Sequence, residues 1–89
     1  MRLQQATMNT RDFINEYADG AVLFDACDSA LIGYGSRVDM EPVAIYSYRL
    51  LVESFIEQGM DEDDASEYVE YNIVGLWAGE RTPIIVYEP

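Results

Sequence analysis

The stretch SYRLLVESFIEQGMD, residues 47–61, decides the fold because it marks the end of one helix and the start of another. Its apolar side chains recur at intervals of three and four residues, which is the pattern of a helix with one buried face. They are Tyr48, Leu51, Val52 and Phe55. Ser47 is a common N-cap residue, so we predict a helix from Ser47 to about Gln58.

A second helix is predicted directly after the first. Gly59 suits the left-handed conformation that ends a helix, and Met60 supplies the hydrophobic contact that accompanies it. Asp61 can cap the following helix, whose acidic first turn complements the positive end of the helix dipole. We expect this helix to end between residues 72 and 79. Its apolar face is expected to carry Ala65, Tyr68, Val69, Asn72, Ile73 and Leu76.

The remaining elements are shorter. A helix is predicted over Thr10–Tyr17, with Asn9 or Thr10 as its cap and Asp12 in its first turn. Apolar runs bounded by turn residues predict strands, at residues 21–24, 30–34, 43–46 and 83–87. We expect the second and third of these to form an antiparallel hairpin, joined by a loop that covers residues 35–41.

This order of elements predicts an α+β domain. The expected architecture is a small three- to four-stranded, mainly antiparallel sheet with two to three helices packed on one face, around a β-β-α-α-β core. The chain of 89 residues has room for one domain, which we place at residues 9–89. Residues 1–8 are expected to be a flexible arm, and an arm that packs on the sheet is the alternative.

The composition excludes several classes of function. Seventeen acidic and five basic residues give a formal net charge of −12. Direct binding of nucleic acid or of anionic membranes needs the opposite charge balance. No apolar run is long enough to span a bilayer, and the N-terminal residues lack the apolar core of a signal peptide. The single cysteine, Cys27, forms no disulfide within the chain, so a cytoplasmic location is expected.

Catalysis and cofactor binding are also restricted. The chain has no histidine and no lysine, which removes the imidazole bases, histidine metal ligands and Schiff-base amines that many enzymes use. Residues 61–64 lack the glycine and the spacing of a calcium loop, and residues 25–28 are a poor set of zinc ligands. We therefore expect no enzyme activity, no cofactor and no metal site.

Acidic residues on the helix predicted to follow Asp61, the third helix along the chain, form the most distinctive pattern. Asp63, Glu67 and Glu70 lie at positions i, i+4 and i+7, about 6 and 4.5 Å apart along a helix axis, and Glu62 widens the start of this row. The row is a candidate docking face for a basic protein, which it could engage by imitating phosphates. The alternative is that these acids cap the helix and solvate its outer face.

The charge density of the chain is lower than that of nucleic acid. Seventeen carboxylates on an expected surface of about 5,300 Å² give one per roughly 310 Å². A DNA duplex carries about one charge per 110 Å² of its cylinder. Imitation therefore requires the row to combine with other acids, such as Glu53, Glu57 or Glu80.

The segment Trp77–Pro83 supplies the other candidate site residues. A tryptophan beside glycine and polar residues can anchor a protein interface, so we expect Trp77 and Glu80 to contact the partner. A single tryptophan in so small a domain can equally fill the core, which is the alternative for Trp77.

Part of the chain resembles a group of small uncharacterised phage and prophage proteins. The resemblance covers residues 28–86, and its most specific part is the pattern Asn-Ile-x-Gly-x-Trp-x-Gly-Glu-x-Thr-Pro at residues 72–83. This chain departs from that group in lacking lysine and in its additional N-terminal residues. The resemblance implies a shared fold and a phage setting, and it transfers no catalytic role.

Small acidic phage proteins often inhibit host machinery, including restriction and CRISPR systems. This argument is only an analogy with a class of proteins. The leading hypothesis is an interaction protein that binds a basic, nucleic-acid-binding or defence protein of the host. A self-associating subunit, including a homodimer, is the second hypothesis. A domain that binds a small molecule or a metal, or a minimal enzyme that uses carboxylates, is the third.

Overall fold

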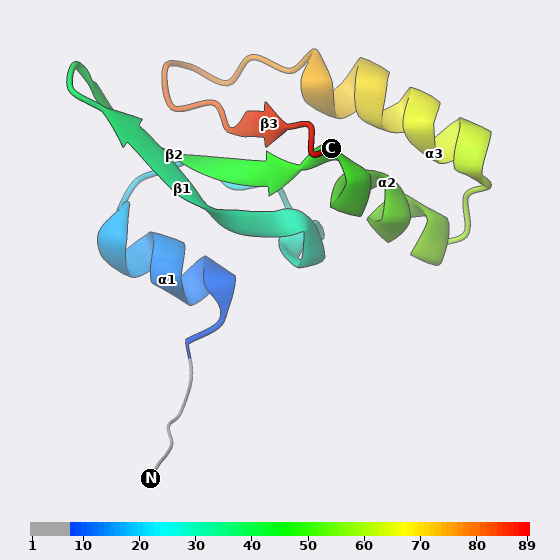
Figure 1. Cartoon of the computed structure of the whole chain (residues 1–89), viewed down its shortest axis with the longest axis horizontal. Helices are drawn as coiled ribbons and strands as arrows, with labels where there is room; N and C mark the ends of the chain where they lie inside the picture. The colour runs from blue at the N-terminus through cyan, green and yellow to red at the C-terminus, as the bar shows by residue number, and fades with distance from the viewer. Residues whose placement is uncertain (1–7) are drawn as a thin grey trace, which may run out of the picture.

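The computed structural model describes residues 8–89. The arm predicted for residues 1–8 therefore lies, except for Met8, outside the described residues. The helical elements are α1 (Thr10–Tyr17), η1 (Asp28–Ala30), α2 (Tyr48–Glu57), α3 (Glu62–Val69) and the π-helical turn η2 (Glu70–Val74). The strands are β1 (Leu31–Arg37), β2 (Met40–Ser47) and β3 (Ile84–Val86) (Figure 1). The predicted α+β class is confirmed.

The three strands form one sheet in the order β1-β2-β3. β1 and β2 are antiparallel, whereas β2 and β3 are parallel, with Ile45 opposite Ile84 and Ser47 opposite Val86. The prediction of a mainly antiparallel sheet is corrected to a mixed one. The parallel pair arises because α2 and α3 together carry the chain back, so that β3 enters the sheet in the same direction as β2.

The β1–β2 hairpin is longer than the sequence predicted. Instead of a loop over residues 35–41, both strands continue to a two-residue turn at Val38 and Asp39. Gly35 lies within β1 and does not open a loop. Its lack of a side chain leaves space for the side chain of Ile45. A Cβ atom built on Gly35 would lie 3.2 Å from Cδ1 of Ile45. Register shifts flank Gly33 and Gly35, so these glycines mark irregular pairing within a strand.

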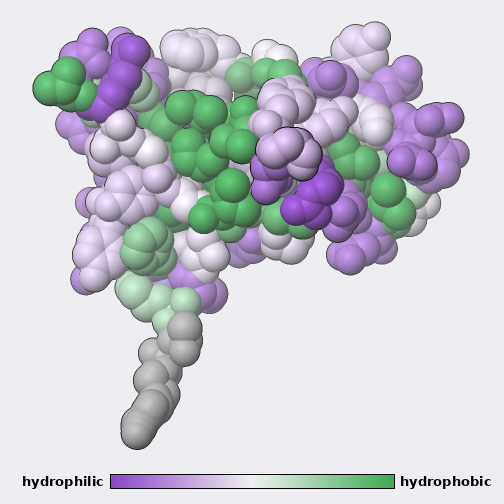
Figure 2. Space-filling view, in the orientation of Figure 1, coloured by the Kyte–Doolittle hydropathy of each residue, from purple (hydrophilic) through white to green (hydrophobic). Residues whose placement is uncertain are grey.

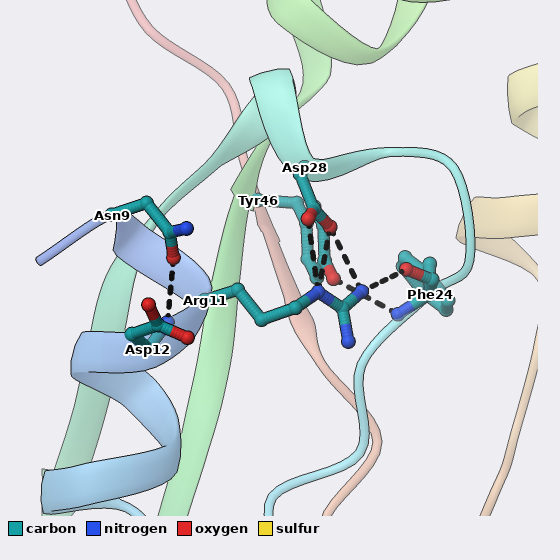
Figure 3. A network of polar contacts seen from close by, with 6 residues as sticks. All are labelled: Asn9, Arg11, Asp12, Phe24, Asp28 and Tyr46. Carbon is teal, nitrogen blue, oxygen red and sulfur yellow. Dashed lines mark hydrogen bonds and ion pairs between the residues drawn. The ribbon is translucent and has the colours of Figure 1, made fainter.

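The predicted strand at residues 21–24 is absent from the described part of the chain, where this segment has no regular secondary structure. Its backbone is held by side chains instead of a strand partner. The N–H of Phe24 donates to the Tyr46 hydroxyl oxygen at 2.9 Å, and the Phe24 carbonyl accepts from Nη2 of Arg11 at 2.9 Å. Arg11 also forms an ion pair with Asp28 at 2.8 Å, which ties α1 to η1 (Figure 3).

Helix ends follow the predicted caps closely. The Asn9 side chain accepts the N–H of Asp12, the Ser47 hydroxyl accepts the N–H of Leu50, and the Asp61 side chain accepts the N–H of Asp64. After α2, Gly59 has φ +114°, and the N–H of Met60 donates to the carbonyl of Phe55 at 3.1 Å. This is the glycine-terminated helix end that the sequence predicted.

The core lies on one face of the sheet. Leu31, Ala44 and Tyr46 of the strands share a cluster of buried side chains with residues from all three helices. The helical contributors are Ile14, Leu51, Phe55, Ala65 and Val69. In Figure 1, α1 lies beside β1, whereas α2 and α3 lie beyond the end of β2.

The apolar face predicted for the third helix is only partly buried. Ala65 and Val69 are buried, but Asn72 is exposed and Leu76 is 43% exposed. The chain changes from α- to π-helical hydrogen bonding at Glu70. The wider turn rotates later side chains away from the face that an α-helix would have presented to the core.

Candidate functional site

The acidic row on α3 forms one surface with an aromatic residue. Asp63, Glu67 and Glu70 line a shallow depression of about 570 Å³ together with Ser66 and Tyr71. We call these five residues the α3 acidic surface. The three carboxylates are exposed, as is Tyr71, which has 77% of its surface accessible. The structure thus brings together the three acids predicted from their spacing.

Tyr71 was not among the predicted site residues. Together with Glu67, it also lines a second depression of about 350 Å³ on the other side. The rest of that depression is formed by Met60, Asp64, Tyr68 and Asn72. Glu67 and Tyr71 therefore form a ridge between two shallow depressions. The helical spacing was a usable signal, because Tyr71 follows Glu67 by four residues.

Glu62 lies elsewhere on the helix. It lines a groove between α2 and α3 that also contains Arg49 and Glu53. Successive side chains on a helix are about 100° apart, so Glu62 and Asp63 point in clearly different directions. Arg49 forms an ion pair with Glu53 at 3.3 Å, which partly neutralises this groove.

Trp77 and Glu80 follow η2 in an irregular segment, and neither lines the depressions around Glu67. Trp77 is 72% exposed, so the alternative that it fills the core is wrong. The segment is held by Thr82, whose hydroxyl accepts the N–H of Ala78 at 2.7 Å and donates to the carbonyl of Gly79 at 2.6 Å. Trp77 is therefore presented to solvent by a hydrogen-bonded turn.

The positive charges of the described chain are used internally. Arg11, Arg37 and Arg49 form ion pairs with carboxylates. Arg81 donates to the carbonyl oxygens of Pro42 and Asp19. Only four carboxylates take part in these ion pairs: Asp28, Asp39, Glu53 and Glu88.

The other thirteen of the seventeen carboxylates have no ion-pair partner among residues 8–89. All six acids between Asp61 and Glu70 belong to this unpaired set. Partial burial, with the nearby charge of Glu70, raises the pKa of Tyr87, the residue that follows β3. The α3 acidic surface therefore offers negative charge that the described chain does not neutralise.

The remaining reactive groups offer little chemistry. Cys27 is 2% exposed, and burial, with the charges of Asp28 and Asp25, raises the pKa of its thiol. A protonated, buried thiol is a poor nucleophile. Across residues 8–89, no group of three or more acidic or cysteine side chains is arranged to hold a metal ion. No helix in that range is both long and apolar enough to cross a bilayer.

No protein-family model, curated protein or solved structure matches this chain. The functional argument therefore rests on the α3 acidic surface itself.

Proposed function

We propose that this protein is a non-catalytic interaction protein that binds a basic protein surface through the α3 acidic surface. The observation that carries the proposal is the joint exposure of Asp63, Glu67 and Glu70 beside Tyr71. Carboxylates at this spacing can accept charge-assisted hydrogen bonds from arginine or lysine. The exposed ring of Tyr71 can add a cation–π contact with the same group.

The chemistry of the surface suggests the class of partner. A protein that binds nucleic acid presents arginine and lysine side chains spaced to meet phosphates. Three carboxylates in a row could occupy part of such a surface. In line with the resemblance to phage proteins, we propose a nucleic-acid-binding or defence protein of a bacterial host, met in its cytoplasm and inhibited by occupancy of its basic surface.

The net charge of −12 supports fast association with such a partner. Long-range attraction steers oppositely charged proteins together, and this attraction falls as ionic strength rises. The complex is therefore expected to form more slowly in high salt. Trp77, Glu62 and Glu80 are proposed as additional contacts outside the α3 acidic surface, with the exposed Trp77 as an aromatic anchor.

The test compares two triple variants of equal net charge. One carries Asp63→Lys, Glu67→Lys and Glu70→Lys. The matched control carries Glu16→Lys, Asp25→Lys and Glu41→Lys, which change three exposed acids outside α3 that have no ion-pair partner among residues 8–89. Both variants have a formal charge of −6 instead of −12. A third variant with Asp63→Asn, Glu67→Gln and Glu70→Gln removes the charges without reversing them.

Each protein is immobilised, and host proteins are captured from a bacterial lysate at about 0.05 M and about 0.5 M NaCl. We expect the wild type and the control to retain the same basic protein at low salt and to lose most of it at high salt. Both α3 variants should retain at least about tenfold less. Equal capture by the α3 variants, or an equal loss in the control, would contradict the proposal. Circular dichroism verifies that each variant is folded.

A further inference from the structure

The sheet has a second apolar face, opposite the one that carries the core cluster. The strand register places Gly35 opposite Val43, Gly33 opposite Ile45, and Ile45 opposite Ile84. Because side chains alternate along a strand, these residues share the face opposite Ala44 and Tyr46. We call Gly33, Gly35, Val43, Ile45, Ile84 and Val86 the outer sheet face. None of them belongs to the core cluster, but only Ile84 is clearly exposed, at 47%, whereas Val43 is 1% exposed.

Figure 2 shows a hydrophobic area over the strands, with more hydrophilic areas at both ends of the same view. At the hairpin end of the outer sheet face lies a small depression of about 170 Å³, lined by Gly35, Ser36, Arg37, Met40, Val43 and Ile84. Gly35 lines this depression, and a Cβ atom added there would lie 3.2 Å from Cδ1 of Ile45. A cavity of about 150 Å³ can hold a benzene molecule, so this one can accept a valine side chain.

The hairpin turn next to this depression exposes a valine side chain, that of Val38. Val38 is fully exposed at the end of the hairpin, which projects from the molecule in Figure 1. Turn positions favour glycine, asparagine, aspartate and serine, so the valine is not explained by the conformation of the turn. Arg37 and Asp39 flank Val38 and form an ion pair at 3.0 Å. This end of the molecule therefore combines an apolar protrusion and an apolar depression with the charges of Arg37, Asp39 and the exposed Glu41.

We propose that this end of the sheet binds a second copy of the same chain in a twofold-symmetric dimer. In a contact of this kind the same patch acts on both sides, so protrusion and depression must lie together on one copy. Here they do, because Arg37 lines the depression and directly precedes Val38. The Val38 side chain of each copy would enter the depression of the other.

Charge complementarity favours a second copy over a basic partner at this face. A twofold axis near Val38 would place Arg37 of one copy against Asp39 of the other, and the reverse. The Arg37–Asp39 pair is neutral and Glu41 adds one negative charge nearby, whereas three unpaired carboxylates line the α3 acidic surface. Two chains of charge −12 repel each other, and their approach costs less where the local negative charge is lower.

The size of the contact indicates its strength. A stable interface buries about 800 Å² on each partner, about one seventh of the 5730 Å² accessible surface of this chain. β2 has eight residues and β3 has three, so the whole outer sheet face measures at most about 26 Å by about 15 Å, or about 400 Å². A contact around Val38 covers only part of this face and falls well short of 800 Å², so we expect a weak, transient dimer.

Sedimentation velocity from about 5 to about 500 µM protein tests this dimer. The wild type should pass from monomer to dimer over this range, and more readily at high salt, because salt screens the repulsion between the two negative copies. The variant Val38→Asn keeps a residue suited to the turn and should weaken the dimer by at least about tenfold. A wild type that stays monomeric at every concentration and salt would overturn the proposal.

A charge exchange tests the proposed pairing directly. Arg37→Asp alone places acid against acid and should abolish the dimer, whereas the double variant Arg37→Asp with Asp39→Arg should restore it. Leu76→Ser, at a site 43% exposed beyond η2, is the control and should dimerise as the wild type does. A dimer that survives both Val38→Asn and Arg37→Asp uses another surface and contradicts the proposal.

This inference is independent of the proposed function. Capture of a basic protein weakens with salt, whereas the dimer strengthens, and the α3 variants, which carry less net negative charge, should dimerise at least as readily as the wild type. If either the proposed function or the proposed dimer fails its test, the test of the other can still be interpreted.

Discussion

The hydroxyl oxygen of Tyr46 accepts the backbone N–H of Phe24 at 2.9 Å in the buried core, across 22 positions of sequence (Figure 3). Tyr46 is fully buried, and this burial raises the pKa of its phenol. The Phe24 N–H has no neighbouring strand to bond to in a sheet, and the Tyr46 hydroxyl oxygen is its acceptor instead. This hydrogen bond thereby fixes the loop between α1 and η1 against the middle strand of the sheet.

Tyr46→Phe should destabilise the protein by about 1–3 kcal/mol, because the buried N–H of Phe24 loses its acceptor while the ring packing remains. The matched control is Tyr71→Phe, which removes a hydroxyl from a side chain that is 77% exposed. Its free energy of unfolding should differ from that of the wild type by less than about 0.5 kcal/mol. Urea denaturation followed by circular dichroism measures both values, and equal effects would contradict the role given to Tyr46.

Asp28→Asn should reduce stability at neutral pH and have no effect in acid. Hydrogen bonding to Arg11 lowers the pKa of Asp28 in the folded protein below its unfolded value. The stabilisation is therefore fully present above the unfolded pKa of about 4, and it is lost as the pH falls through the lower folded pKa.

We expect a difference of at most about 1 kcal/mol between wild type and Asp28→Asn at pH 7, because both partners are partly exposed to solvent. Urea denaturation of both proteins over a pH series measures it. Asp25→Asn is the control, since Asp25 has no ion-pair partner among residues 8–89. A difference that persists unchanged at the lowest pH would contradict the ion-pair explanation.

Gly59→Ala should destabilise the protein by about 1–2 kcal/mol. The φ of +114° at Gly59 is unfavourable for any residue with a Cβ atom, although the added methyl would meet no atom within 4 Å. Gly75→Ala is the matched control, because Gly75 has φ −81° and its new methyl would lie 3.6 Å from the carbonyl oxygen of Tyr71. This control should be neutral or more stable by up to about 1 kcal/mol. Thermal unfolding distinguishes the two, and equal losses would argue against conformational strain at Gly59.

Glu67→Gln with Glu70→Gln should stabilise the free protein while it weakens partner capture. Both carboxylates lie near the negative end of the α3 dipole and among other unpaired acids. Their removal should raise the melting temperature at low salt, and added salt should reduce that gain by screening the repulsion in the wild type. A melting temperature below that of the wild type at low salt would show that these acids stabilise the fold.

Helices were predictable from this sequence because their signals are local. Asn9, Ser47 and Asp61 each cap a helix through a backbone N–H three residues ahead, and Gly59 ends α2. These interactions depend on a few neighbouring residues, which a single sequence displays. The row of Asp63, Glu67 and Glu70 was predictable for the same reason.

The features that sequence reasoning missed depend on distant parts of the chain. The pairing of β3 with β2 is set by the path of α2 and α3, which no local pattern encodes. Gly35 was interpreted as a loop residue because the close approach of Ile45 could not be seen. Leu76 and Trp77 are exposed in the segment that follows the π-helical turn, and composition gives no sign of that turn.

The parallel pairing of β3 has a consequence for how the molecule assembles. Ile45 and Ile84 face each other across 39 positions of sequence, whereas β1 and β2 meet through a turn of two residues. Closing the longer loop costs more chain entropy, so the hairpin should form early and β3 should dock late along the folding route. Shortening Ile85 to alanine would then accelerate unfolding and leave the rate of folding nearly untouched. The seam between β2 and β3 is accordingly where we expect amide hydrogens of the sheet to exchange first.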